Sequence, residues 1–285
     1  MRRLSAGLLL LAGLFPALFG ACRAGDKRSP PRQDLAASWM LMSDEARAQL
    51  GAAVPAAAEV AGELARLSEA AQRAVGAKRG QAAVAALNDF LFVESGFKRE
   101  VDDPDLRFML LPYVVEKKRG SCLGLAGLYL ALARKLDLPV SGVLVPGHFF
   151  LRLGAGQGHV NIELLRRGER MPDDWYRKKW KVPQKAKAFM RALTESETLA
   201  VVRFNLGNEY RTRGKYEQAL LQYRQAVSDF PDFAEAYADM GLTYQLRRDY
   251  ILAQKAYQRA AQLQPTLPGL EKNLAELRRQ MQAAR

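Results

Sequence analysis

The sequence contains few of the residues that hold metal ions or form disulfide frameworks. Of its 285 residues only two are cysteines, Cys22 and Cys122, and only two are histidines, His148 and His159. Two cysteines are too few for a disulfide scaffold, and no metal-ligand cluster has a recognised spacing. The glycines do not form a phosphate-binding loop between a strand and a helix. We therefore expect neither a metal nor another cofactor.

Long apolar runs are also scarce, because after the N-terminal segment none is long enough to span a membrane. That segment has two arginines, an apolar stretch over 8–19 that contains a proline, and two small residues before Cys22. This order predicts a signal peptide over 1–22. The small pair before the cysteine is similar to a bacterial lipobox, which favours lipidation of Cys22 over plain secretion, with a tether over 23–33. We expect a membrane-anchored lipoprotein of the cell envelope, facing the periplasm or the exterior.

Acidic residues are outnumbered, with 30 against 43 basic ones and a net charge of +13. Such an excess often indicates nucleic-acid binding, but an exported protein meets little nucleic acid, and we expect no such partner. Attraction to anionic lipid headgroups or to acidic envelope polymers is the favoured consequence. A generally high arginine content accounts for the same charge without any partner.

An apolar stretch after Cys122 predicts a helix over 122–136 that is buried on most sides. Ser121 is a suitable N-cap, which places Cys122 in the first turn. Without a partner cysteine, this thiol is either a buried small hydrophobic residue or a reactive group. The first turn favours a thiolate, because backbone N–H groups and the helix dipole stabilise negative charge. Three basic residues at 117–119 add positive potential.

The apolar pattern then changes to that of strands, at 143–145, 148–153 and 159–164. A hairpin turn at 154–157 connects the last two. If the turn has two central residues, His148 lies directly opposite Glu163, with Cβ atoms about 5 Å apart. One further loop residue would place them on opposite faces. His159 lies near the turn and is expected to be solvated.

Cys122, His148 and Glu163 supply the groups of a nucleophile, its base and the residue that orients the base. Together with the first-turn amides, which are available to an oxyanion, they permit acyl transfer from an amide or ester through a thioester. Each also has a structural interpretation, since His148 starts a strand and Glu163 can pair with a surface arginine. Three other carboxylates compete for the third role: Glu94, Asp173 and Asp174.

The C-terminal third contains a repeat of seven residues with a period of 34. Gly207, Tyr210, Tyr216, Ala219, Tyr223, Ala226 and Pro231 recur as Gly241, Tyr244, Tyr250, Ala253, Tyr257, Ala260 and Pro265. This period is typical of tetratricopeptide units. It predicts two helical units over 198–265 and a capping helix over 266–285, packed on the preceding domain because two units are few for a free-standing array. We expect a protein or peptide partner in the groove. Its candidate contacts are Asn208, Tyr210, Tyr244 and Arg247.

The middle of the chain resembles the transglutaminase-like superfamily, in the bacterial SirB-type branch where tetratricopeptide repeats follow this domain. The matching motifs are LNDFLF at 87–92, ESGF at 94–97, RGSCLGL at 119–125, LPV at 138–140, PGHFF at 146–150 and NIE at 161–163. The resemblance implies an α+β, papain-like domain over 34–190, with Cys122 on the central helix and His148 on an adjacent strand. Glu163 stands where the superfamily usually has aspartate.

Two functions follow from these observations. The first is an exported thiol-dependent enzyme, a peptidase, amidase or acyl transferase that acts on a peptide or cell-envelope amide. The second is a non-catalytic scaffold, in which an inert transglutaminase-like domain carries repeats that bind a partner.

Overall fold

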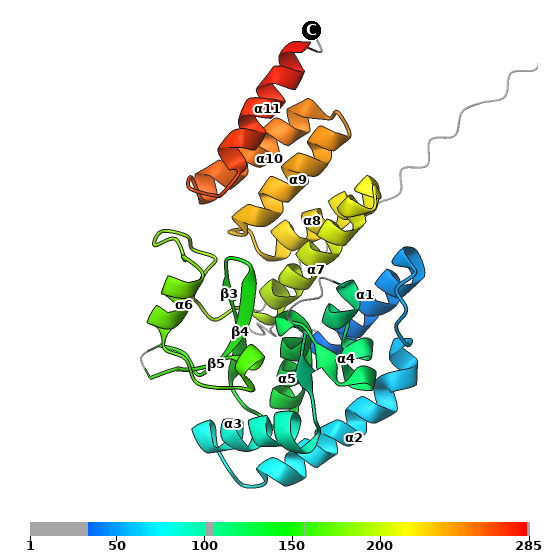
Figure 1. Ribbon diagram of the computed structural model, residues 1–285, viewed down its shortest axis with the longest axis vertical. Helices are drawn as coiled ribbons and strands as arrows, with labels where there is room; N and C mark the ends of the chain where they lie inside the picture. Colours follow the sequence, from blue (N-terminus) through cyan, green and yellow to red (C-terminus); the bar gives the residue numbers. More distant parts are fainter. Residues whose placement is uncertain (1–33, 101–104, 157, 284–285) are drawn as a thin grey trace, which may run out of the picture. The chain divides into compact units, whose positions relative to one another are not determined.

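The computed structural model describes residues 34–100, 105–156 and 158–283. The predicted signal peptide, the tether and Cys22 lie outside these residues. The described chain is a mixed α+β region followed by a purely helical one, which confirms the predicted fold class (Figure 1). Within the described ranges, no helix combines the length and apolar composition needed to cross a membrane.

The α+β region begins with helices and ends with a small sheet. Its helices are α1 (Leu35–Leu50), α2 (Ala57–Val75), α3 (Gly80–Asp89), α4 (Leu111–Lys117), α5 (Cys122–Lys135) and α6 (Asp173–Lys179). Short π or 3-10 segments occupy Phe90–Glu94, Leu106–Met109 and Leu164–Arg166. An antiparallel sheet has the order β3 (Val140–Val145), β4 (His148–Leu153), β5 (Val160–Ile162), and β1 (Lys98–Arg99) pairs in parallel with β2 (Arg119–Gly120).

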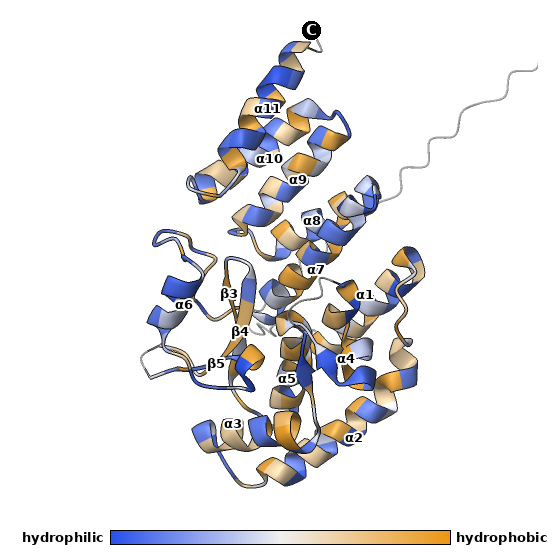
Figure 2. Ribbon diagram, viewed as in Figure 1, coloured by the Kyte–Doolittle hydropathy of each residue, from blue (hydrophilic) through white to orange (hydrophobic). Residues whose placement is uncertain are grey.

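Helix α5 is the most buried helix of this region, as its apolar residues predict, and it is mostly hydrophobic in Figure 2. The Ser121 Oγ accepts a hydrogen bond from the Gly124 backbone N–H at 3.2 Å, which is the expected N-cap. A Cβ on Gly124 would lie 2.0 Å from the backbone oxygen of Phe108. Only glycine permits this approach, and the contact fixes the end of α5 that carries Cys122.

The pairing of β4 with β5 differs from the predicted register, in which His148 lies directly opposite Glu163. Leu153 pairs with Val160, so the connection has six residues instead of a two-residue turn. The strand pairing ends before Glu163, and the prediction of direct opposition is wrong. A shift of two residues keeps every side chain on its face of the sheet, so Glu163 remains on the side of His148.

Helix α6 covers one face of β4. His148, Phe150 and Arg152 alternate along the strand and share this face. The ring of Tyr176 stacks on Phe150 with 3.7 Å between centroids, and that of Trp180 stacks on His148. The helix thus places aromatic rings over the strand residue that begins the candidate site.

The helical region consists of two helix pairs and a final helix: α7 (Glu195–Thr212), α8 (Tyr216–Asp229), α9 (Ala234–Leu246), α10 (Tyr250–Leu263) and α11 (Leu270–Ala283). The repeated glycines lie where the helices of each pair cross. A Cβ on Gly207 would lie 2.6 Å from the Tyr223 ring, and one on Gly241 would lie 2.7 Å from the Tyr257 ring. The glycine recurs every 34 residues because the two helices of each pair cross so closely at this position that no side chain fits.

The first helix pair packs against α1, which confirms that the array docks on the preceding region. Gln222 of α8 donates from Nε2 to the Glu45 Oε1 of α1 at 3.0 Å. Arg213, in the α7–α8 turn, donates to the backbone oxygen of Leu50 at the end of α1. These contacts make α1 a shared element of the two regions.

Candidate active site

Cys122 is the first residue of α5 and is half-buried. Its position follows from the Ser121 cap, which starts the helix one residue earlier. First-turn backbone N–H groups have no partner within the helix and point toward the N-terminus. The Gly124 N–H is taken by the Ser121 cap, which leaves the N–H groups of Cys122 and Leu123 for an anion next to the thiol.

His148 and Glu163 form a buried hydrogen-bonded pair. The His148 Nε2 donates to the Glu163 Oε2 at 2.8 Å, and the two side chains are only 3% and 1% exposed. The other carboxylate oxygen, Oε1, accepts from the Leu165 backbone N–H at 2.9 Å. Both carboxylate oxygens are thus held in place, so the orientation of the imidazole is fixed.

Cys122 lies close enough to the imidazole of His148 to act, together with Glu163, in raising its pKa. Because Nε2 is engaged by Glu163, the Nδ1 nitrogen is the one that remains for the sulfur. The structure therefore brings the three residues together in the order thiol, imidazole, carboxylate.

The electrostatics of this cluster favour a charged imidazole. Burial by itself would lower the pKa of His148, but the hydrogen bonds and charges of Cys122 and Glu163 act in the opposite direction and raise that pKa to about 9. Opposite charges at short range stabilise the charged form of an ionisable group. At neutral pH the imidazole is accordingly protonated, and it lies between the sulfur of Cys122 and the carboxylate of Glu163.

Aromatic rings from α6 and the residue after it shield this pair, and the sequence patterns did not single them out. Trp180 lies parallel to the His148 ring, with 4.2 Å between centroids and an angle of 6°. Behind it, Tyr176 has no exposed surface, and burial first, then the charge of Glu163, raise the pKa of its hydroxyl. The rings exclude water from the His148–Glu163 bond, which strengthens it.

A second polar cluster, the Arg152–Asp173 clamp, fastens the start of α6 to the sheet. The Asp173 Oδ1 accepts from the Arg152 Nη2 at 2.8 Å, from the Asn161 Nδ2 at 2.7 Å and from the His159 Nε2 at 3.1 Å. Partial burial would raise the pKa of Asp173, but these hydrogen bonds and the Arg152 charge lower it. His159 is therefore not simply solvated, as the sequence suggested.

The carboxylates that compete with Glu163 are thereby separated from it. Asp173 is engaged by the clamp, while Glu94 and Asp174 are exposed. Of the four candidates, only Glu163 forms a hydrogen bond with His148 among the described residues.

The predicted contacts in the repeats have different environments. Tyr210 has no exposed surface and lies near Glu45 of α1, whose charge adds to burial in raising the pKa of its hydroxyl to about 12. Its expected place in an open groove is therefore wrong, because α1 packs against α7. Asn208 accepts from the Tyr223 hydroxyl at 2.6 Å. Tyr244 is half-buried.

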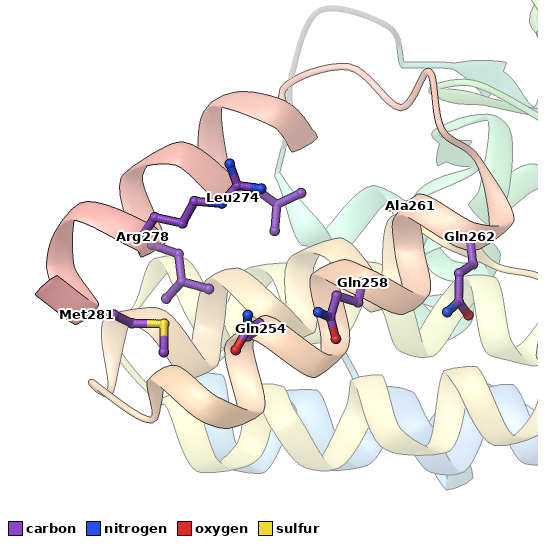
Figure 3. A pocket seen from close by; sticks show the side chains of 8 residues that line it. Gln254, Gln258, Ala261, Gln262, Leu274, Arg278 and Met281 are labelled. Atoms are coloured by element: carbon purple, nitrogen blue, oxygen red, sulfur yellow. The ribbon is translucent and has the colours of Figure 1, made fainter.

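The last predicted repeat contact, Arg247, pairs with Glu217 of α8 and with Asp249, at 2.5 and 3.2 Å. A cavity of about 460 Å³ lies further along the array, between α10 and α11 (Figure 3). Gln258, Leu274 and Met281 are among its lining residues, and none of the three candidate catalytic residues is. In the described ranges, no group of three or more His, Cys, Asp or Glu side chains could hold a metal ion.

An α+β region in which thiol, imidazole and carboxylate side chains lie together at the start of a buried helix is followed here by helical repeats. The profile of the transglutaminase-like superfamily matches residues 58–203, just over half of the sequence. The chain belongs to this superfamily. Two tetratricopeptide profiles match residues 207–246 and 234–267.

The chain is also similar to curated proteins at low identity. A UPF0162 protein of Xylella fastidiosa is 28% identical over 170 residues, which cover 56% of this chain and 60% of the relative. The chain thus spans about 60% of the length of the first curated relatives that it matches.

Two solved structures are also similar. They are a menin crystal structure (TM-score 0.44, 12% identity, 81% of this chain and 65% of that one) and a TGase crystal structure (TM-score 0.29, 13% identity, 49% and 41%). Because both TM-scores lie below 0.5, neither likeness bears on the assignment.

Proposed function

We propose that this protein is a thiol-dependent acyl-transfer enzyme, a peptidase, amidase or transferase, whose substrate is a peptide or cell-envelope amide. The observation that carries the proposal is the buried imidazole of His148, which is hydrogen-bonded to the Glu163 carboxylate at 2.8 Å and lies close enough to Cys122 for the thiol to raise its pKa. A histidine with only a structural role needs neither a thiol at the start of a helix nor a carboxylate that is itself fixed.

The geometry supports a two-stage reaction. The Cys122 thiolate attacks the carbonyl carbon, and the negative oxygen that forms is stabilised by the first-turn N–H groups of α5. The His148 imidazolium then gives its proton to the leaving amine as the carbon–nitrogen bond breaks, which leaves a thioester. Water or a second amine attacks the thioester, and His148 takes the proton of that nucleophile before the thiolate departs.

Glu163 keeps the imidazole oriented and stabilises its positive charge. It lies beyond the last residue of β5 and not directly across from His148. The glutamate side chain is one methylene longer than aspartate, and this length allows the carboxylate to reach Nε2 from its position along the sheet.

The experiment that tests the proposal is the alkylation of Cys122 by iodoacetamide as a function of pH, in a Cys22→Ala chain that has a single thiol. We expect a rate plateau that begins well below the free-thiol value of about 8.5. His148→Ala should abolish the plateau. His159→Ala, which removes the other histidine, should preserve it. A rate that rises only near the free-thiol value in every chain would leave Cys122 a structural residue.

The scaffold function is the second candidate, because tetratricopeptide repeats suggest protein–protein interaction. The two functions are compatible, since the repeats can recruit the enzyme or present its substrate. They are separated by Cys122→Ala in cells that lack the wild-type gene: full rescue of the deletion phenotype supports the scaffold, and loss of rescue supports the enzyme.

We also propose export of the protein, lipidation at Cys22 and membership of the SirB-type branch. The first two proposals rest on the order of charged, apolar and small residues before Cys22. The third rests on the transglutaminase-like domain with following repeats. Cys22→Ala should shift the protein from the membrane fraction to the soluble envelope fraction; an unchanged distribution would argue against the anchor.

A further inference from the structure

The excess of basic residues is concentrated beside the candidate active site. The segment 164–187, which follows Glu163, contains nine basic and three acidic residues, a net charge of +6 out of +13 for the whole chain. A generally basic composition would spread the charge evenly along the sequence. The concentration therefore calls for a local explanation.

The densest part is the run 177–187, defined here as the basic segment. It contains six basic residues, all of them exposed: Arg177, Lys178, Lys179, Lys181, Lys185 and Lys187. Elsewhere many arginines are neutralised, as Arg191 is by Glu197. None of the six forms an ion pair with another residue in the described ranges, so their positive potential is directed at the solvent.

The basic segment is joined directly to the catalytic cluster. Trp180, in its middle, stacks on the His148 ring at 4.2 Å. The Lys179 Nζ lies 4.5 and 4.6 Å from the ring centroids of Trp175 and Trp180. A cation therefore contacts the same indole that shields His148. The Arg152–Asp173 clamp holds the start of the same helix on the sheet. A ligand of these cations would lie next to the Cys122–His148 pair.

We propose that the substrate of this site is a carboxylate-rich peptide, whose acidic side chains bind the basic segment while the acyl group lies at Cys122. This proposal names the substrate class for the acyl-transfer function and rests on it. Unpaired lysines are strongly hydrated point charges that attract anions at long range and raise the local concentration of an anionic substrate.

A membrane surface fits the same segment less well. Amphipathic segments that insert into a lipid surface place large apolar side chains among the headgroups. The exposed large apolar residues of the described chain are Leu41, Val93, Leu221, Leu246, Ile251 and Leu252. None of them lies in 164–187. The indoles of Trp175 and Trp180 meet edge-on at 5.1 Å, Trp180 stacks on His148 and the Lys179 ammonium lies over both indoles, so these rings already have partners where nucleic-acid bases would stack.

The test measures how decaglutamate protects Cys122 from iodoacetamide in the full Cys22→Ala chain. Iodoacetamide is uncharged, so the substitutions do not alter its attraction to the site. We expect decaglutamate to slow alkylation in a saturable manner, and high salt to remove the protection, because it shortens the screening length from about 30 Å at 0.01 M to about 3 Å at 1 M.

Charge reversal locates the binding surface. The double variant Lys178→Glu, Lys181→Glu should weaken protection by about tenfold or more. The matched variant Lys255→Glu, Lys272→Glu has the same change in net charge at exposed positions on α10 and α11, and should protect as the parent does. Equal weakening in both variants, or no protection in the parent, would overturn the proposal.

Two further measurements, vesicle binding and the pH dependence of alkylation, distinguish a lipid ligand and a failure of the acyl-transfer function from the proposed substrate. If anionic vesicles bind through Lys178 and Lys181 while decaglutamate gives no protection, the segment contacts lipid and the proposal is wrong. Protection needs only an accessible thiol and not an activated one. A chain that lacks the low-pH alkylation plateau but is protected by decaglutamate would therefore refute the acyl-transfer function while retaining the anionic ligand.

Discussion

Replacing Asp173 by asparagine should release α6 from the sheet, and the structure allows the size of the effect to be worked out. Arg152 has a side chain only 7% exposed and donates to Asp173, to the Asn161 side chain at 2.8 Å and to the Met190 backbone oxygen at 3.0 Å. Without the carboxylate, a buried guanidinium keeps two neutral acceptors and no counter-ion. Breaking a fully buried pair costs about 3–5 kcal/mol.

The cost is smaller here, because the Asp173 side chain is 32% exposed and water screens its charge. Asparagine also retains one acceptor oxygen. We therefore expect the free energy of unfolding to fall by about 2 kcal/mol, the range of hydrogen bonds to charged groups. The matched control is Asp174→Asn, which removes an exposed carboxylate from the same first turn of α6. It should change stability by less than about 0.5 kcal/mol.

Urea unfolding followed by circular dichroism measures the global effect, and limited trypsin digestion with mass spectrometry measures the local one. Undocking of α6 should expose bonds after Arg177, Lys178 and Lys179 in Asp173→Asn but not in Asp174→Asn. Iodoacetamide alkylation should then lose part of its low-pH plateau, since Trp180 no longer shields His148. Equal effects of the two substitutions would show that a first-turn carboxylate matters only for the helix dipole, and would refute the clamp.

Three further predictions concern the site and the repeats. Glu163→Gln should slow alkylation of Cys122 at pH 7 by about tenfold, the factor for one pKa unit of lost imidazolium stabilisation, while Glu169→Gln, on an exposed neighbour, should not. Because the pKa of His148 is raised to about 9 from 6.5, its contribution to stability is complete below pH 6.5 and is lost as pH rises through 9. The wild type should therefore lose up to about 3 kcal/mol more than His148→Gln over that interval in urea titrations; parallel pH profiles would contradict this. Gly207→Ala should destabilise the protein by about 1–3 kcal/mol, because the added Cβ would meet Tyr223 at 2.6 Å. Gly62→Ala, where nothing lies within 4 Å, should stabilise α2 by about 0.5–1 kcal/mol in the same assay.

Local patterns along the chain were sufficient to predict the elements that carry the site. Ser121 as an N-cap and the apolar residues after it predict where α5 begins, and the observed helix starts at Cys122. The 34-residue spacing of glycine and tyrosine predicts the helix pairs, because Gly207 and Tyr223 touch within one unit. In these cases the interacting residues are close in sequence, so the sequence alone carries the information.

Predictions failed where the length of a loop or a distant contact decides the structure. The connection after Leu153 contains Gly154, Gly156 and Gly158, all with positive φ, so several turn lengths were compatible with the sequence and the longer one forms. Tyr210 occupies the same repeat position as Tyr244, yet it is buried because α1, far away in the sequence, covers α7. A periodic pattern cannot distinguish an open groove from one that another region fills.

The aromatic cover of His148 shows most clearly what a search for catalytic residue types leaves out. Tyr176 and Trp180 are not among the residue types that a search for a nucleophile, its base and an orienting carboxylate selects. They also lie in a strongly basic stretch of sequence, which is typical of a solvated loop. Their contribution arises from position: Trp180 covers the imidazole, and Tyr176 connects that cover to Phe150 of β4. The same segment presents exposed lysines to the solvent. One stretch of chain thus shields the His148–Glu163 bond on its inner side and offers an anion-binding surface on its outer side. A substrate whose acidic groups bind this surface would have its acyl group close to Cys122.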